Sequence, residues 1–93
     1  MTVGYREVSL HIHGVDSLKG KRRVVKSIVE RLRSRFNLSI SEVDQHDLWQ
    51  SAVIGLAVVS NNRRHIQQVL DEAVRQMEYS GEVEVIEVTT EIL

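Results

Sequence analysis

Apolar residues recur at two different spacings along this chain, and the order of the two spacings limits the folds it can adopt. Residues 7–13 alternate between polar and apolar, which predicts a strand with one buried face. Residues 25–36 instead carry an apolar stripe at helical spacing. The members of this stripe are Val25, Ile28, Val29, Leu32 and Phe36. The chain therefore begins with a strand and continues into an amphipathic helix, for which Asp16 or Ser17 can serve as the N-cap.

Two further strands are predicted in the middle of the chain. Leu38 and Ile40 begin the first of them, and a polar turn follows at residues 44–47. Residues 49–59 are then largely apolar at both parities. Because a strand that is apolar on both faces usually lies in the middle of a sheet, we expect this strand to be central. The β-α-β-β-α-β order makes the first strand central too.

The last third of the chain predicts one more helix and one more strand. Ser60 or Asn61 can cap the helix, Gly81 can end it, and residues 82–88 alternate again. The apolar stripe of this helix consists of Ile66, Val69, Leu70, Ala73, Val74 and Met77. The order β-α-β-β-α-β over residues 1–93 predicts a single ferredoxin-like α+β domain, a four-stranded antiparallel sheet with two helices on one face.

Composition excludes several classes of function. The chain has no cysteine, which excludes disulfides, thiolate catalysis and cysteine-ligated zinc. No P-loop, G-x-G-x-x-G or G-x-S-x-G motif occurs, so we expect no cofactor and no enzymatic activity. No apolar run approaches the ~20 residues of a membrane span, and no signal-peptide pattern opens the chain. We therefore expect a cytoplasmic protein that does not engage a membrane.

Positive charge is concentrated around the first predicted helix, although the whole chain has net charge −1. The cations of residues 17–36 are Lys19, Lys21, Arg22, Arg23, Lys26, Arg31, Arg33 and Arg35. Cations in a first helical turn oppose the helix dipole, so a purely structural helix would favour acids there. A helix N-terminus also attracts phosphate. We predict phosphate contacts by Lys19, Lys21, Arg22, Arg23 and Lys26, extended by Arg33; a merely solvated helix face is the alternative.

The predicted topology brings other side chains to the same end of the molecule. The first strand ends at His13, where the basic helix begins, and the hairpin that carries His46 and Trp49 lies at that edge too. These three residues are expected to flank the phosphate-binding site. RNA-recognition domains share this topology but stack bases on central-strand aromatics, which residues 51–59 lack.

Two other functions remain open on the same pattern. The open face of the sheet, with Trp49, Val53, Ala57 and Val59, can pair with a second copy, since a bare face of this kind usually meets something and two-fold dimers are the commonest assembly. The second alternative is a small hydrolase or a metal-dependent enzyme that uses the histidines. Its candidate residues are His11, His13, His46 and Asp47, although no further ligand spacing supports a metal site.

Four sequence blocks together resemble the YlxP family, a bacterial domain of unknown function. They are "SLKGKRR" (17–23), "RLRSRFN" (31–37), "EVDQHDLWQ" (42–50) and "VVSN" (58–61). The resemblance covers nearly the whole chain and implies a ferredoxin-like α+β fold. Genes of that family often lie beside translation-initiation and ribosome-maturation factors, which implies a role near RNA or the ribosome. The expected function is thus a non-enzymatic module that binds ribosomal RNA or a ribosomal subunit, as a homodimer.

Overall fold

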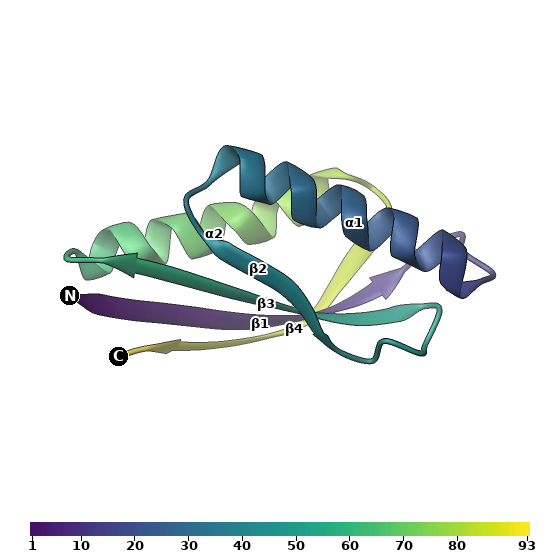
Figure 1. The fold of residues 1–93 in the computed structure, drawn as a ribbon, viewed down its shortest axis with the longest axis horizontal. Helices are drawn as coiled ribbons and strands as arrows, with labels where there is room; N and C mark the ends of the chain where they lie inside the picture. Colours follow the sequence, from purple (N-terminus) through teal and green to yellow (C-terminus); the bar gives the residue numbers. More distant parts are fainter.

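Four antiparallel strands form one sheet in the order β2-β3-β1-β4. The computed structural model describes all of residues 1–93. Its elements are β1 (Thr2–Ile12), α1 (Leu18–Arg35), β2 (Ser39–Asp44), β3 (Ser51–Ser60), α2 (Arg63–Tyr79) and β4 (Val83–Ile92). The predicted β-α-β-β-α-β fold is confirmed, and the two strands expected to be central, β1 and β3, are central (Figure 1).

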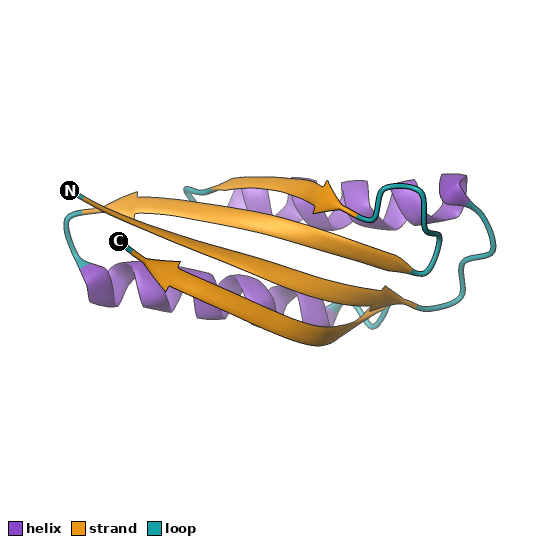
Figure 2. Cartoon of the chain, turned by 90° about the horizontal axis from the view of Figure 1, so that it is seen from below, coloured by secondary structure: helices purple, strands orange, loops and turns teal.

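Both helices cover the same face of the sheet and leave the other face open (Figures 1 and 2). Alternate residues of the central strands point toward the helices, which explains the period of two in the sequence. The inward side chains of β1 and β3 are Val8, Leu10, Ile12, Ala52, Ile54, Leu56 and Val58, all buried. Together with the apolar stripes of α1 and α2 they form one hydrophobic cluster.

The helix starts agree with the prediction for α1 but not for α2. Ser17 caps α1, and its Oγ accepts a hydrogen bond from the Gly20 amide at 3.0 Å. The cap of α2 is Asn62 rather than Ser60 or Asn61, because its Oδ1 accepts from the Arg64 amide at 2.9 Å. The helix begins later than predicted since Ser60 still belongs to β3.

The buried sides of α1 and β1 depart from the predicted stripes at four positions. Val24 and Lys21 of α1 are buried, while Val29 is only partly so. Arg6 lies on the inward face of β1 and is 6% exposed. Its guanidinium pairs with Asp71 of α2 at 2.9 Å and its Nε donates to the Thr90 hydroxyl at 2.8 Å. This charge therefore enters the interior with both a carboxylate and a hydroxyl partner.

One glycine is required by the way α2 approaches the sheet. Gly4 of β1 is buried, and a Cβ at this position would lie 2.2 Å from Cγ2 of Ile66. The start of α2 thus packs directly on the backbone of β1. Neither helix is long and apolar enough to cross a membrane.

Candidate nucleic-acid interface

The outer side of α1 carries four exposed cations near its N-terminus, Lys19, Arg22, Arg23 and Lys26. No hydrogen bond or ion pair within the chain engages their side chains. At 100° per residue they lie within one sector, opposite the buried Ile28. The first turn of α1 contains no acid, so the helix dipole and the free cations add to the same positive potential.

Lys21 was predicted to belong to this surface, but it is fully buried, with 0% of its side chain exposed. Its ammonium lies 2.8 Å from Oε2 of Glu42 on β2 and donates to the Gln45 carbonyl at 2.5 Å. The Glu42 oxygen receives no aligned hydrogen bond, so its contact with Lys21 is electrostatic rather than directed. The ammonium is thus enclosed by protein groups, and Lys21 does not belong to the exposed basic surface of α1.

A signal for this burial was present in the sequence. Lys21 precedes Val25, Ile28 and Leu32 by four, seven and eleven residues, the spacing of one helix face. The predicted stripe contains only apolar residues, so it leaves out Lys21, which begins the same helix face. Arg6 carries a similar signal, because it shares the parity of Val8 on β1.

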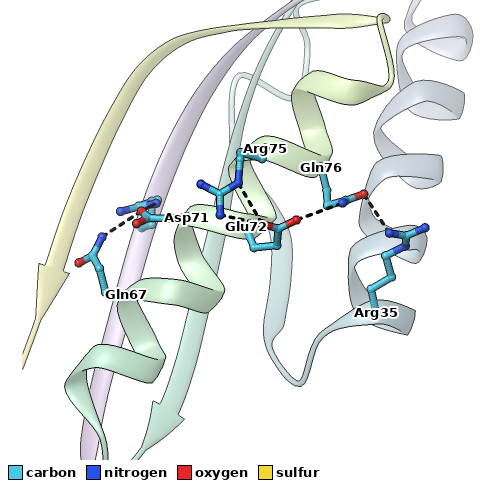
Figure 3. Close-up of polar contacts among 7 residues, drawn as sticks. Arg35, Gln67, Asp71, Glu72, Arg75 and Gln76 are labelled. Carbon is cyan, nitrogen blue, oxygen red and sulfur yellow. Dashed lines mark hydrogen bonds and ion pairs between the residues drawn. The ribbon is translucent and has the colours of Figure 1, made fainter.

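Three other arginines of α1 hold the fold together. Arg33, predicted to extend the stripe, is exposed but donates through Nη2 to the Ile40 carbonyl at 3.2 Å. Arg31 donates to the Gln76 carbonyl at 3.3 Å, and Arg35 donates to the Gln76 side-chain oxygen at 3.2 Å (Figure 3). Arg33 therefore stays at the margin of the surface, whereas Arg31 and Arg35 join α1 to α2.

Gln76 is itself positioned by an ion pair on α2. Its amide nitrogen donates to Glu72 at 3.3 Å, and Arg75 donates to the same carboxylate at 2.7 and 2.9 Å (Figure 3). Hydrogen bonds from Arg75 and Gln76 lower the pKa of Glu72 below its ordinary value. The chain of contacts from Arg35 through Gln76 and Glu72 to Arg75 thus spans both helices.

The residues predicted to flank the site lie at the end of the molecule that was expected. His13 donates its amide to Glu82 at 2.9 Å, and the β2–β3 hairpin is tied to α1 through Lys21 and Gln45. Gln45 has a positive φ of 61°, so the hairpin turns sharply at that contact. Trp49, in the same hairpin, is 49% exposed. No hydrogen bond or ion pair joins these side chains to the exposed cations of α1, so their part in binding stays a prediction.

The histidines form no compact ligand set. The rings of His11 and His13 meet edge to face with centroids 5.0 Å apart, while Nε2 of His46 lies 3.2 Å from the Glu42 carbonyl. No group of three or more histidine and carboxylate side chains is arranged to hold a metal ion. The residues proposed for a hydrolase or metal enzyme, Asp47 included, therefore do not converge on one point.

The open face of the sheet has the opposite charge from α1. Glu7, Glu84, Glu87 and Glu91 pair across the strands with Gly55, His11, Ser9 and Tyr5, which places them on the open face because cross-strand partners share a face. No lysine or arginine lies on that face. The Tyr5 hydroxyl donates to Glu91, which raises the pKa of Tyr5. The free cations of α1 and these carboxylates thus lie on opposite faces of the domain.

Comparison with known proteins establishes the family. Residues 3–90 match the family described as "Protein of unknown function (DUF503)". The chain belongs to the DUF503 family. It is also 35% identical over 82 residues to "Uncharacterized protein YlxP" of Bacillus subtilis (strain 168), which covers 88% of this chain and 89% of that protein. The resemblance to YlxP seen in the sequence blocks is therefore confirmed.

Solved structures share the fold of this DUF503 protein but little of its sequence. The designed protein Foldit4 matches with a TM-score of 0.57 and 17% identity, covering 98% of this chain and 97% of that chain. A structural-genomics protein, YJCS, matches with a TM-score of 0.56 and 10% identity, covering 96% of each chain. These similarities show the ferredoxin-like architecture and nothing about activity.

Proposed function

We propose that this DUF503 protein is a non-enzymatic RNA-binding module that contacts ribosomal RNA or a ribosomal subunit through α1. The observation that carries the proposal is the group of exposed, unpaired cations at the start of α1, Lys19, Arg22, Arg23 and Lys26. A stabilising role within the fold does not account for them, because none contacts an acid and Lys19, in the first turn, opposes the helix dipole. Phosphate is the ligand that suits both features.

The length of the basic surface favours a chain of phosphates over a single anion. Lys19 and Lys26 are seven residues apart, or ~10 Å along the helix axis, and Arg33 lies another ~10 Å further on. A single phosphate group is too small to contact cations over this distance. RNA is favoured over DNA by the gene neighbourhood that the resemblance to the YlxP family implies.

The test compares two pairs of arginines that carry the same charge. The variant Arg22→Ala/Arg23→Ala removes two cations from the proposed surface. The control, Arg63→Ala/Arg64→Ala, removes two exposed cations from the first turn of α2, at the opposite end of the molecule (Figure 1). Lys21 is left unchanged, because the loss of its ammonium would disturb the buried pair with Glu42.

Co-sedimentation with ribosomal subunits and titration of ribosomal RNA, both over a salt series, give the readout. For wild type and the control, the logarithm of the affinity should fall linearly with the logarithm of the salt concentration. For Arg22→Ala/Arg23→Ala the slope should be smaller by ~1.4, because each lost phosphate contact to single-stranded RNA contributes about 0.7. The proposal fails if wild type shows no binding at ~50 mM salt, where such contacts are strongest. An equal change in both double variants would also contradict it.

A further inference from the structure

Trp49 is the only tryptophan of the chain, and the structure leaves it outside the hydrophobic core. It is 49% exposed, and the neighbouring Leu48 is 51% exposed. Both residues precede β3 in the β2–β3 hairpin and line a pocket of about 310 Å³, together with Asp47, Gln50 and Ser51. A pocket of this volume lies at the lower end of the range for small-molecule sites. A tryptophan and a leucine exposed at such a pocket are suited to contact a flat ring.

The hairpin that carries this pocket is fixed beside the start of α1. The Gln45 carbonyl accepts a hydrogen bond from the Leu48 amide at 3.2 Å and another from the Lys21 ammonium at 2.5 Å. One carbonyl thus closes the turn that leads into Trp49 and joins that turn to the first turns of α1. The hairpin and the start of α1 accordingly lie at the same end of the molecule (Figure 1). The pocket is therefore held next to the basic surface of α1.

Carboxylates in the hairpin decide which part of an RNA chain can enter the pocket. Asp47 lines it, and Asp44 ends β2 directly before the turn. Both repel phosphate, so an RNA backbone held by the cations of α1 can present only an uncharged base to the pocket. Proteins commonly bind unpaired bases of single-stranded RNA by stacking them on aromatic side chains. We propose that Trp49 stacks on an unpaired base of the RNA whose phosphates contact α1, an inference that rests on the proposed function.

The carboxylate of Asp47 also makes the pocket selective among bases. An ionised carboxylate only accepts hydrogen bonds. The exocyclic amino group of cytosine can donate one, whereas uracil has a carbonyl oxygen at the corresponding position. Asp47 therefore favours cytosine over uracil, and the RNA that suits this site is single-stranded and carries a base with an amino group beside the phosphates bound by α1.

Trp49 is itself the probe for this proposal, because no other tryptophan contributes to the fluorescence of the chain. Oligocytidine of about ten nucleotides, a length within the range of single-stranded binding sites, should quench this fluorescence as it binds. Inorganic polyphosphate carries the charges without the bases, so it should bind without quenching. Oligouridine should bind several-fold more weakly than oligocytidine. Asp47→Asn should remove that difference, because an amide both donates and accepts hydrogen bonds.

Affinity measurements on variants separate the pocket from the basic surface. Trp49→Ala should bind oligocytidine about 10-fold more weakly, the loss expected for one stacked base. Its salt slope and its affinity for polyphosphate should stay those of wild type, which also shows that the variant is folded. The control Tyr79→Ala removes an aromatic side chain that is 81% exposed at the end of α2, and it should bind both ligands like wild type. Arg22→Ala/Arg23→Ala should bind both more weakly.

The outcomes distinguish this proposal from the proposed function. If oligocytidine binds without quenching, and as tightly to Trp49→Ala as to wild type, the stacking role is wrong while RNA binding by α1 stands. Equal affinity of wild type for oligocytidine and oligouridine would overturn the selectivity assigned to Asp47. If neither oligocytidine nor polyphosphate binds wild type at ~50 mM salt, the proposed function of α1 fails as well.

Discussion

Lys21 shows most clearly how one residue can change its role between sequence and structure. In the sequence it is one of five cations within eight residues. In the fold its ammonium is buried against Glu42 and the Gln45 carbonyl, and it joins the first turns of α1 to the β2–β3 hairpin. The long aliphatic stem packs on the apolar side of the helix, so only the charged tip requires polar partners.

Removing that ammonium should mainly lower the free energy of unfolding, with a smaller effect on the affinity for RNA. Lys21→Met keeps the apolar stem but leaves Glu42, whose side chain is only 15% exposed, without its cation. We expect a loss of ~2–3 kcal/mol in the free energy of unfolding, measured by urea denaturation, somewhat below the range for fully buried pairs because Glu42 is partly exposed.

A second variant distinguishes the ion pair from the packing. In Lys21→Met/Glu42→Leu no unpaired charge remains, and buried pairs can often be replaced by apolar residues at little cost. The double variant should therefore recover most of the lost stability. If it is as unstable as Lys21→Met, the lysine contributes through packing or through its bond to Gln45 rather than through the pair.

At the level of elements, one polar contact between α1 and α2 is supported by the carboxylate of Glu72. Arg31 donates to the Gln76 carbonyl. Arg35 donates to the Gln76 side chain, which Glu72 positions from within α2 (Figure 3). Because the pKa of Glu72 is lowered below 4.5 in the folded protein, its ionised form stabilises the fold at neutral pH. That contribution is lost as pH falls from 4.5 through the lowered pKa.

Replacing Glu72 should therefore weaken the acid dependence of stability. We expect Glu72→Gln to be slightly less stable than wild type at pH 7 and to lose less stability than wild type between pH 5 and pH 3, as urea unfolding at each pH would measure. Glu78→Gln is a suitable control, since Glu78 is exposed on the same helix and makes no ion pair. An unchanged acid slope in Glu72→Gln would contradict the role of this carboxylate.

The starts of the helices illustrate how far local sequence determines element boundaries. For α1 the sequence predicts Asp16 or Ser17, and Ser17 is the cap. For α2 it predicts Ser60 or Asn61, whereas the cap is Asn62, because all three residues are good caps. Strand pairing of Ser60 with Thr2 excludes Ser60, and that pairing is a contact between distant parts of the chain.

At the level of the whole molecule, the basic surface of α1 and the glutamate-bearing open face lie on opposite sides of an elongated domain with extents of 42 × 21 × 17 Å. Viewed down the shortest axis, the helices lie on one side and the sheet on the other (Figure 1).

A substitution on the open face should therefore leave RNA binding unchanged. Val59→Glu is expected to keep the wild-type salt slope for ribosomal RNA, because Val59 lies on the sheet and the α1 surface is intact. A salt slope reduced in Val59→Glu as much as in Arg22→Ala/Arg23→Ala would contradict the assignment of RNA binding to α1.

The amino-acid sequence alone predicts the order of elements, the central position of β1 and β3 and most of the inward-facing residues, because periods of two and 3.6 are local properties of strands and helices. It also placed the basic helix start and the hairpin at one end, since the topology requires this. Only the tertiary structure decided which cations are free. Lys21 is neutralised by Glu42, Arg6 by Asp71, and Arg35 is held by Gln76, and each of these partners is at least 21 residues away along the chain. The sequence shows which residues are charged, but contacts between distant residues determine which partner neutralises each of them.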